Sequence, residues 1–395
     1  MAQDQIISAA HPVSSARSWK MTLASRYPEL GPRIVLVSGG SGARELSQHL
    51  IRFTYRSSHL IPMFDDGGSS RHIRNHFHIP PPGDLRNRMV ALSDSSEGGH
   101  PAVQKLFTTR LAQEGESPAL HQELTQFVQG NHPLMHAMEK RFKQLICSYL
   151  QVFYEHLPKS FDLRGGNLGN FIITGGLLLH QNFDTVLYIL QELVKVRGRI
   201  IPICEGNYFL RAVLNDQSFL DGQQRITREE HFPIQEIRYL EYLDSVPKEL
   251  IPEASSSAFS VLRKGDLLVY TMGSLFTSLL PVLGVKGIAE AIRKAPIPKV
   301  LILNATEDPE TRNFNGPEIL RHFYRTLTGK DDFKQLSEYV HYIICDSRSS
   351  HLPGRIPVQP ELLKEMGLQV FDGPYLDEQN HYIPEKLLRL LFAVL

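Results

Sequence analysis

The sequence predicts an α/β fold built on a doubly wound, mainly parallel sheet. Short runs rich in Ile, Val and Leu alternate along the chain with stretches of helical periodicity. Most of these runs are continuously apolar, which is typical of parallel strands covered on both faces. Glycine-rich or acidic turns follow several of the runs, as expected where a strand of such a sheet passes into a helix.

The predicted elements alternate in order along the chain. Strands are expected at residues 33–37, 59–64, 199–204, 266–272, 299–304 and 340–345. Helices are expected at residues 43–56, 86–93, 168–179, 183–196, 283–294 and 316–327. A last helix over residues 384–395 has an apolar face, which favours packing on the core or on a dimer partner.

Two segments interrupt this alternation. Residues 96–165 contain no good strand, and they predict a helical insertion with helices at 101–110, 120–128 and 133–157. Residues 208–240 have turn signals between short β-like runs, and they predict a small antiparallel excursion. Residues 1–30 mix polar and apolar side chains and are expected to form a weakly ordered amino-terminal extension.

Composition limits the possible partners. The 395 residues suffice for one large domain or two ordinary ones. Lys plus Arg and Asp plus Glu number 42 each, so the charge does not favour nucleic acid or an anionic membrane. No segment approaches the ~18 uninterrupted apolar residues of a membrane span. Three widely spaced cysteines argue against disulfides and zinc, so we expect free thiols and a cytoplasmic protein.

An acidic pair follows the second predicted strand. Asp65 and Asp66 stand together at its end, where two carboxylates are costly to place unless a cation or hydroxylated ligand shares their charge. Gly67 and Gly68 allow a positive-φ turn and close approach of a ligand, and Ser69 with Ser70 is suited to cap a following helix. The alternative interpretation is an acidic strand-to-helix turn with a serine cap.

The first predicted strand ends in a glycine-rich turn. Gly39, Gly40 and Gly42 precede a helix, an arrangement that suits a phosphate group. The turn lacks the Lys-Ser/Thr of a Walker A loop, and Glu45 stands where a dinucleotide fingerprint needs a small residue. By itself the turn is either a tight connection or a phosphate cradle.

Further polar turns follow the same design. The candidate ligand-binding residues in them are Asp84, Arg86, Asn87, Asn167, Asn170, Gly273, Ser274, Thr277, Ser278 and Asn304. Asp84 is expected to cap the helix that begins at Leu85. Because ligands bind beyond the carboxyl ends of strands in open α/β sheets, we expect these turns to line one crevice. Two phosphate-type turns facing an acidic pair suit a diphosphate bridged by Mg²⁺.

Five motifs in order resemble the CofD/YvcK family. They are RIVLVSGGSG, FDDGGSSRHIRNHFHIPPPGDLRNRMVALSD, GGNLGNFIITGGLL, VKVRGRIIPIC and GSLFTSLLPVLGVKGIAEAI, which together span roughly residues 33–330. The resemblance implies a Rossmann-like three-layer α/β/α core over residues 31–395 as a single domain, often a homodimer. The family's Gly-His-Ser is Gly165-Gly166-Asn167 in this chain, so a histidine that contacts phosphate is missing.

The resemblance also implies two functions. Transferase members move a phospholactyl group from a guanosine-diphosphate-linked donor to an acceptor hydroxyl with Mg²⁺, and YvcK-type members bind nucleotide sugars as regulators of carbon metabolism. Carried over by position, Asp65 and Asp66 would hold Mg²⁺ and orient the acceptor, while the glycine turns and Asn170 would cradle a guanosine- or uridine-type ligand. A third alternative, an NAD(P) oxidoreductase, is disfavoured by the missing fingerprint glycine.

Overall fold

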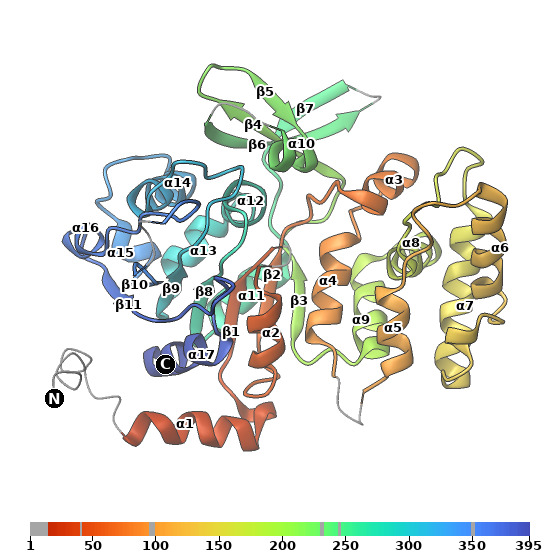
Figure 1. The fold of residues 1–395 in the computed structure, drawn as a ribbon, viewed down its shortest axis with the longest axis horizontal. Coiled ribbons are helices and arrows are strands. Elements are labelled where there is room, and N and C mark those ends of the chain that lie inside the picture. The colour runs from red at the N-terminus through yellow and green to blue at the C-terminus, as the bar shows by residue number, and fades with distance from the viewer. Residues whose placement is uncertain (1–14, 40–41, 95–98, 230–232, 244–245, 349–351) are drawn as a thin grey trace.

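A sheet of seven parallel strands forms the centre of the molecule (Figure 1). The computed structural model describes residues 15–39, 42–94, 99–229, 233–243, 246–348 and 352–395. The strands are β1 Ile34–Val37, β2 Ser58–Ile61, β3 Arg199–Pro202, β8 Leu267–Tyr270, β9 Lys299–Ile302, β10 Tyr342–Cys345 and β11 Gln369–Asp372. They lie in the order β11-β10-β9-β8-β1-β2-β3. The predicted doubly wound, parallel sheet is confirmed.

The strand order reverses beside β1. The chain steps outward from β1 to β2 and β3, and then returns to the other side of β1 with β8. The carboxyl ends of β1 and β8 therefore flank a topological switch point, where a crevice forms because the two connections run in opposite directions.

The helices surround this sheet. The long ones are α1 Ser15–Arg26, α3 Gly68–Phe77, α4 Gly83–Leu92, α5 Pro101–Thr108, α6 Ser117–Val128, α7 Lys140–Glu155, α8 Leu168–His180, α9 Phe183–Val194, α11 Ser256–Lys264, α14 Gly316–Thr328 and α17 Pro384–Val394. The shorter ones are α2 Arg44–Leu50, α10 Gln223–Arg228, α12 Leu280–Leu283, α13 Ile288–Lys294, α15 Leu336–Tyr339 and α16 Pro360–Glu365. Single turns are η1 Pro28–Leu30, η2 Pro133–Met135 and the π-helical η3 Leu275–Leu279.

Two apolar cores lie on the two faces of the sheet. Side chains alternate along each strand, so Val35 and Val37 enter one core while Ile34 and Leu36 enter the other. Helices α4, α8, α11, α13 and α14 contribute to the larger core, and α2 and α17 close the smaller one. The result is a three-layer α/β/α arrangement.

The helical insertion packs beside the sheet and not on top of it. Helices α5 and α7 lie next to α8, and α6 packs on α7, at the right of Figure 1. Helix α7 crosses α8 closely at Gly175, where a Cβ atom would stand 1.9 Å from the carbonyl oxygen of Tyr149. The crossing therefore requires glycine, since any side chain would separate the two helices.

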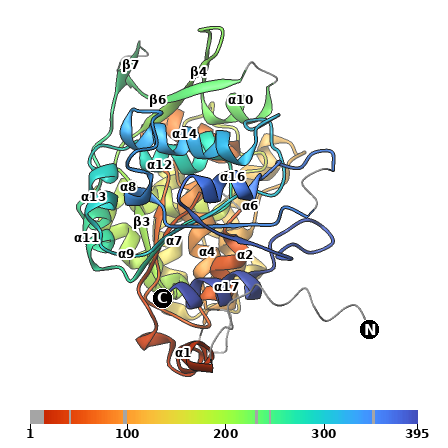
Figure 2. The ribbon, with the colours of Figure 1, turned by 90° about the vertical axis from the view of Figure 1, so that its left-hand side faces the viewer.

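The antiparallel excursion forms a second sheet at one end of the molecule (Figures 1 and 2). Its strands are β4 Tyr208–Leu214, β5 Phe219–Asp221, β6 Ile234–Leu243 and β7 Val246–Leu250, in the order β5-β4-β6-β7. The sheet extends to Leu250, beyond the expected end at residue 240. Strand β7 has no apolar alternation, because all five of its side chains are exposed or half-buried.

Several boundaries differ from the expectation. The helix predicted at 43–56 ends at Leu50, and the strand predicted at 59–64 ends at Ile61. Strand β11 was missed, because an edge strand with exposed Gln369 and Asp372 does not form an apolar run. Residues 1–14 lie outside the described residues, and residues 15–26 of the expected extension form α1, which lies against α17. Within the described ranges, no helix is long and apolar enough to cross a membrane.

Candidate functional site

A cavity of about 640 Å³ opens at the switch point between β1 and β8. Its volume is in the range of small-molecule sites. Six of the predicted ligand-binding residues line it: Gly39, Gly42, Gly273, Ser274, Ser278 and Asn304. Gly40 lies outside the described residues. The structure therefore brings the turns after β1, β8 and β9 into one ligand-sized cavity.

Glycine lets the turns after β1 and β8 touch. A Cβ atom on Gly39 would stand 2.5 Å from the Cβ of Ser278, and one on Gly42 would stand 2.7 Å from the carbonyl oxygen of Met272. Asn304 joins the same wall from β9, because it accepts from the Gly273 N–H at 3.0 Å and donates to the Gly273 carbonyl at 2.7 Å. These contacts hold the turns after β1, β8 and β9 together in one wall of the cavity.

A buried carboxylate occupies the start of η3, where a phosphate was expected. Glu310 is only 2% exposed. It accepts from the N–H groups of Phe276 and Thr277 at 2.9 and 3.1 Å and from the Thr277 hydroxyl at 2.5 Å. Thr277 is therefore turned toward an internal carboxyl group, and it does not line the cavity. No sequence signal marked Glu310, since it stands in a polar turn, Asp308-Pro309-Glu310-Thr311.

Glu310 also connects the core to the excursion. The hydroxyl of Thr227 in α10 donates to it at 3.2 Å, and Thr227 itself lines the cavity. Burial raises the pKa of Glu310 to about 7, with the charge of Asp308 acting in the same direction. The carboxyl thus titrates near neutral pH at the point where η3 of the core contacts α10 of the excursion.

This raised pKa predicts a pH dependence of stability. The folded protein keeps a proton on Glu310 that the unfolded chain releases, because the pKa rises from 4.5 to about 7 on folding. The contribution of this group is complete below pH 4.5 and is lost as the pH rises through about 7. We expect Glu310→Gln to show a smaller fall in Tm than the wild type between about pH 5 and 8. Parallel curves for the two proteins in thermal melts would contradict this expectation.

The acidic pair lies beside the cavity and not in its wall. Asp66 is buried, and its Oδ1 accepts from the N–H of Gln224 at 2.7 Å, at the start of α10. Its Oδ2 is 3.7 Å from the guanidinium of Arg71. Burial raises the pKa of Asp66. Because Gln223 and Thr227 of α10 do line the cavity, Asp66 acts on its shape through this helix.

Asp65 has a freer carboxylate. Its Oδ1 accepts from the N–H of Gly67 at 3.0 Å, and its Oδ2 packs against Gly83, where a Cβ atom would stand 1.9 Å away. The same Cβ atom would stand 2.5 Å from the hydroxyl of Ser70. The residue is half-buried at the end of β2, next to β1.

A buried polar network joins α3, α4 and α8. Asn170 donates to the hydroxyl of Ser69 at 3.0 Å and accepts from Nε of Arg86 at 2.9 Å. Arg86 also donates to Asn87, and Asn167 caps α8 by accepting from the N–H of Asn170. Within the described residues, Arg86 and Asn170 are thus bonded to protein groups and lie outside the cavity wall.

Two capping predictions were wrong. Helix α3 starts at Gly68 with Gly67 as its N-cap, so Ser69 and Ser70 lie inside its first turn. Helix α4 starts at Gly83 after Pro82, so Asp84 also lies inside the helix. Neither N-cap makes a side-chain capping bond, because glycine and proline have no side-chain acceptor.

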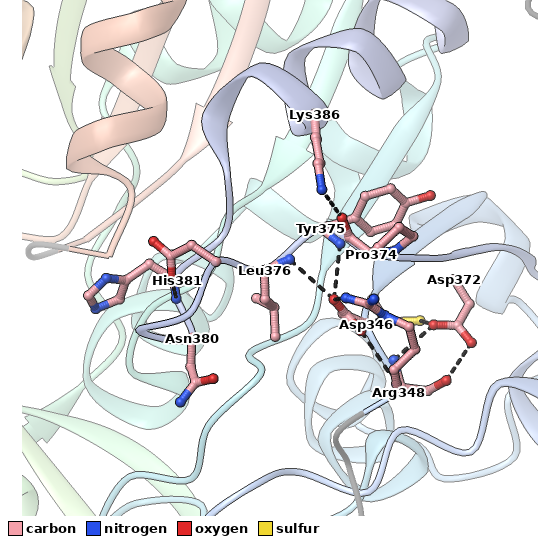
Figure 3. Close-up of polar contacts among 12 residues, drawn as sticks. Asp346, Arg348, Asp372, Pro374, Tyr375, Leu376, Asn380, His381 and Lys386 are labelled. Atoms are coloured by element: carbon pink, nitrogen blue, oxygen red, sulfur yellow. Dashed lines mark hydrogen bonds and ion pairs between the residues drawn. The ribbon is translucent and has the colours of Figure 1, made fainter.

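The carboxyl-terminal loop supplies a wall that the sequence did not indicate. Asn380, His381 and Tyr382 line the cavity, although they follow the last strand. Figure 3 shows how the loop is held: Asp346 accepts from the N–H groups of Tyr375 and Leu376 at 3.0 and 3.1 Å. In the same view the side chain of His381 points away from Asp346.

Two buried polar atoms near the cavity have no hydrogen-bond partner among the described residues. They are Oγ of Ser38, directly before Gly39, and Oε1 of Gln223 in the cavity wall. Buried polar atoms are nearly always paired, so orphans at a cavity indicate groups that a ligand completes. A carbonyl oxygen such as that of Gln223 would take a hydroxyl or N–H donor.

The residues around the acidic pair fit Mg²⁺ only together with a ligand. The described part of the chain contains no group of three or more His, Cys, Asp or Glu side chains arranged to hold a metal. Asp66 is engaged by Gln224 and Arg71, which leaves Asp65 as the available carboxylate. Mg²⁺ often takes one or two carboxylates and completes its shell with substrate phosphates and water, so Asp65 fits this role.

The fold and the site define a doubly wound α/β protein with a ligand cavity at its switch point. A model of the family described as 2-phospho-L-lactate transferase CofD matches residues 34–376, and the chain belongs to this family. The family resemblance seen in the sequence is confirmed. Asn380, His381 and Tyr382 lie beyond the matched residues.

Individual relatives match most of the chain. The chain is 27% identical over 375 residues to the gluconeogenesis factor of Bacillus subtilis strain 168, which covers 89% of this chain and 93% of the relative. It is 27% identical over 294 residues to the gluconeogenesis factor of Listeria monocytogenes EGD-e, a match that covers 74% of this chain and 73% of the relative. A crystal structure of a Bacillus halodurans protein described as a UPF0052 family member matches with a TM-score of 0.69 at 22% identity. The match covers 91% of this chain and 98% of that protein. This last likeness shows the fold.

Proposed function

We propose that the cavity binds a nucleotide-diphosphate-linked small molecule of guanosine or uridine type, and that the protein is a Mg²⁺-dependent transferase. The observation that carries the proposal is the set of glycine- and serine-rich turns around one cavity at the switch point. The N–H groups of Gly273, Phe276 and Thr277 are already bonded to Asn304 and Glu310. The hydroxyls of Ser274 and Ser278 and the glycine turn after β1 are therefore the groups that suit phosphate oxygens, and Oε1 of Gln223 suits a donor on the sugar or base.

The proposed reaction is an in-line displacement at phosphorus. An acceptor hydroxyl oxygen bonds to the phosphorus farther from the nucleoside, the bond from that phosphorus to the bridging oxygen breaks, and a nucleoside monophosphate leaves. Asp65 orients the hydroxyl and takes its proton, which passes to water. Mg²⁺, when bound, neutralises charge on the diphosphate. Such chemistry requires mainly positioning and charge neutralisation.

Asp65→Asn tests the transferase. We expect a loss of transfer of about 100-fold or more, because the amide neither takes the proton nor holds Mg²⁺ well. Nucleotide affinity measured without Mg²⁺ should stay within about threefold of wild type, since Asp65 lies outside the cavity wall. Asp184→Asn, an exposed change on α9, is the matched control. Full Mg²⁺-dependent transfer by Asp65→Asn would contradict the proposed role.

A second candidate is a regulator that binds a nucleotide sugar without breaking a bond. Two observations favour it: Asp66 is engaged within the protein, and the relatives described above are named gluconeogenesis factors. Calorimetry with guanosine and uridine diphosphate sugars, followed by an assay for released nucleoside monophosphate, separates the two. Saturable binding with no release supports the regulator, and release supports the transferase.

A further inference from the structure

A second cavity, of about 810 Å³, lies between α2, α4 and α5. Its lining contains four basic side chains, Arg44, Arg52, Lys105 and Arg197. Of the described residues that line it, Asp94 alone is acidic. The whole chain has a formal net charge of zero, so this concentration of positive charge is a local property of the cavity.

Among the described residues of the lining, most of this charge has no acidic partner. Asp94 pairs with Arg197 at 2.7 Å, so these two groups balance each other. Arg44, Arg52 and Lys105 form no ion pair with any described residue, which leaves a formal surplus of three positive charges facing one cavity. Like charges held together repel unless an anion binds among them, so the arrangement is more favourable with an anionic ligand.

The far wall of the cavity is already ordered. The guanidinium of Arg197 lies 4.6 Å from the ring centre of Tyr55, and both its Nε and NH2 groups donate to Asp94. The side-chain amide of Gln104 donates to the main-chain carbonyl of Asp94. A wall fixed in this way loses little conformational freedom on binding. It also presents an aromatic ring and an amide beside the charged groups.

We propose that this second cavity is a binding site for a small molecule that carries phosphate groups. Two or more phosphate oxygens would meet Arg52, in the turn just after α2, and Lys105 of α5. The volume fits a ligand of nucleotide size. A nucleic-acid surface is a poorer match, because the charge is confined to one cavity of a chain with no net charge.

Inorganic pyrophosphate is the probe for this site. The test variant is Arg52→Gln combined with Lys105→Gln, which spares Arg44 because that residue lines both cavities. The matched control, Lys140→Gln with Lys264→Gln, removes the same charge at exposed positions outside either cavity. In calorimetry we expect saturable binding to the wild type, at least about tenfold weaker binding to the test variant, and control affinity within about twofold.

Hydrogen exchange locates the bound pyrophosphate. Slower exchange in peptides covering residues 48–55 and 101–108, absent from the test variant, is the result we expect. Slower exchange at residues 272–278 instead would place the anion in the switch-point cavity, which overturns this proposal and leaves the proposed function intact. Equal affinity of wild type and test variant, an equal loss in the control, or no saturable binding would also overturn it. So would an oligonucleotide that binds more tightly than pyrophosphate with the same dependence on Arg52 and Lys105.

Discussion

Replacing Glu310 with alanine is expected to lower the free energy of unfolding by about 3–5 kcal/mol, because it leaves buried donors without an acceptor. The side chain accepts from the N–H groups of Phe276 and Thr277 and from two hydroxyls. Each buried N–H left unsatisfied costs about 1–3 kcal/mol. Denaturant unfolding followed by circular dichroism measures the loss.

Two further variants make this prediction specific. Glu378→Ala removes an exposed carboxylate and should change the free energy of unfolding by no more than about 0.5 kcal/mol. Glu310→Gln keeps one acceptor oxygen in place and should cost less than the alanine change. A loss below about 1 kcal/mol in Glu310→Ala would show that water reaches these donors and that the carboxylate does not hold η3.

Replacing Arg74 with methionine is expected to cost a similar amount, about 3–5 kcal/mol, because the buried carbonyls that it satisfies lose their donor. Arg74 is fully buried, and it donates to the carbonyls of Phe64 and Asp65 at 3.1 and 2.9 Å and to Asn207 at 2.8 Å. It also donates to the carbonyl of Tyr208, where β4 begins. One side chain thus connects the end of β2 to the excursion.

The location of the effect distinguishes this role from general destabilisation. Amide exchange in β4 and β6 should become faster than exchange in β1 and β8, because the excursion loses its attachment while the central sheet keeps its own. Arg263→Met, an exposed change on α11, is the control and should leave both patterns unchanged. Equal acceleration in both sheets would contradict the proposed attachment.

The interior of the fold was predictable, and its edges were not. Six of the seven parallel strands stood out as apolar runs, because a strand covered on both faces is apolar at most positions. Strands β7 and β11 have exposed side chains, so their residues need not be apolar. They therefore leave no apolar run in the sequence. Helix α10 is only six residues long and depends on Asp66, which lies far away in the chain.

The candidate site divides in the same way. Gly39, Gly42, Gly273, Ser274, Ser278 and Asn304 were found because each stands in the connection after a strand, and parallel strands place such connections at one edge. His381 and its neighbours were missed because their loop returns to the cavity from beyond the last strand. Arg86 and Asn170 were predicted to bind the ligand, yet the structure bonds them to each other and Asn170 to Ser69, outside the cavity wall.

By itself, the sequence determined the doubly wound sheet, the family and the turns at the switch point, since these depend on local patterns of apolar residues and glycine. Only the tertiary structure decided which charged groups remain available for a ligand. Glu310 reaches η3 across 34 positions, and Asp66 reaches α10 across 158. Such contacts depend on strand order and burial, because a carboxylate removed from water must find donors wherever the fold brings them.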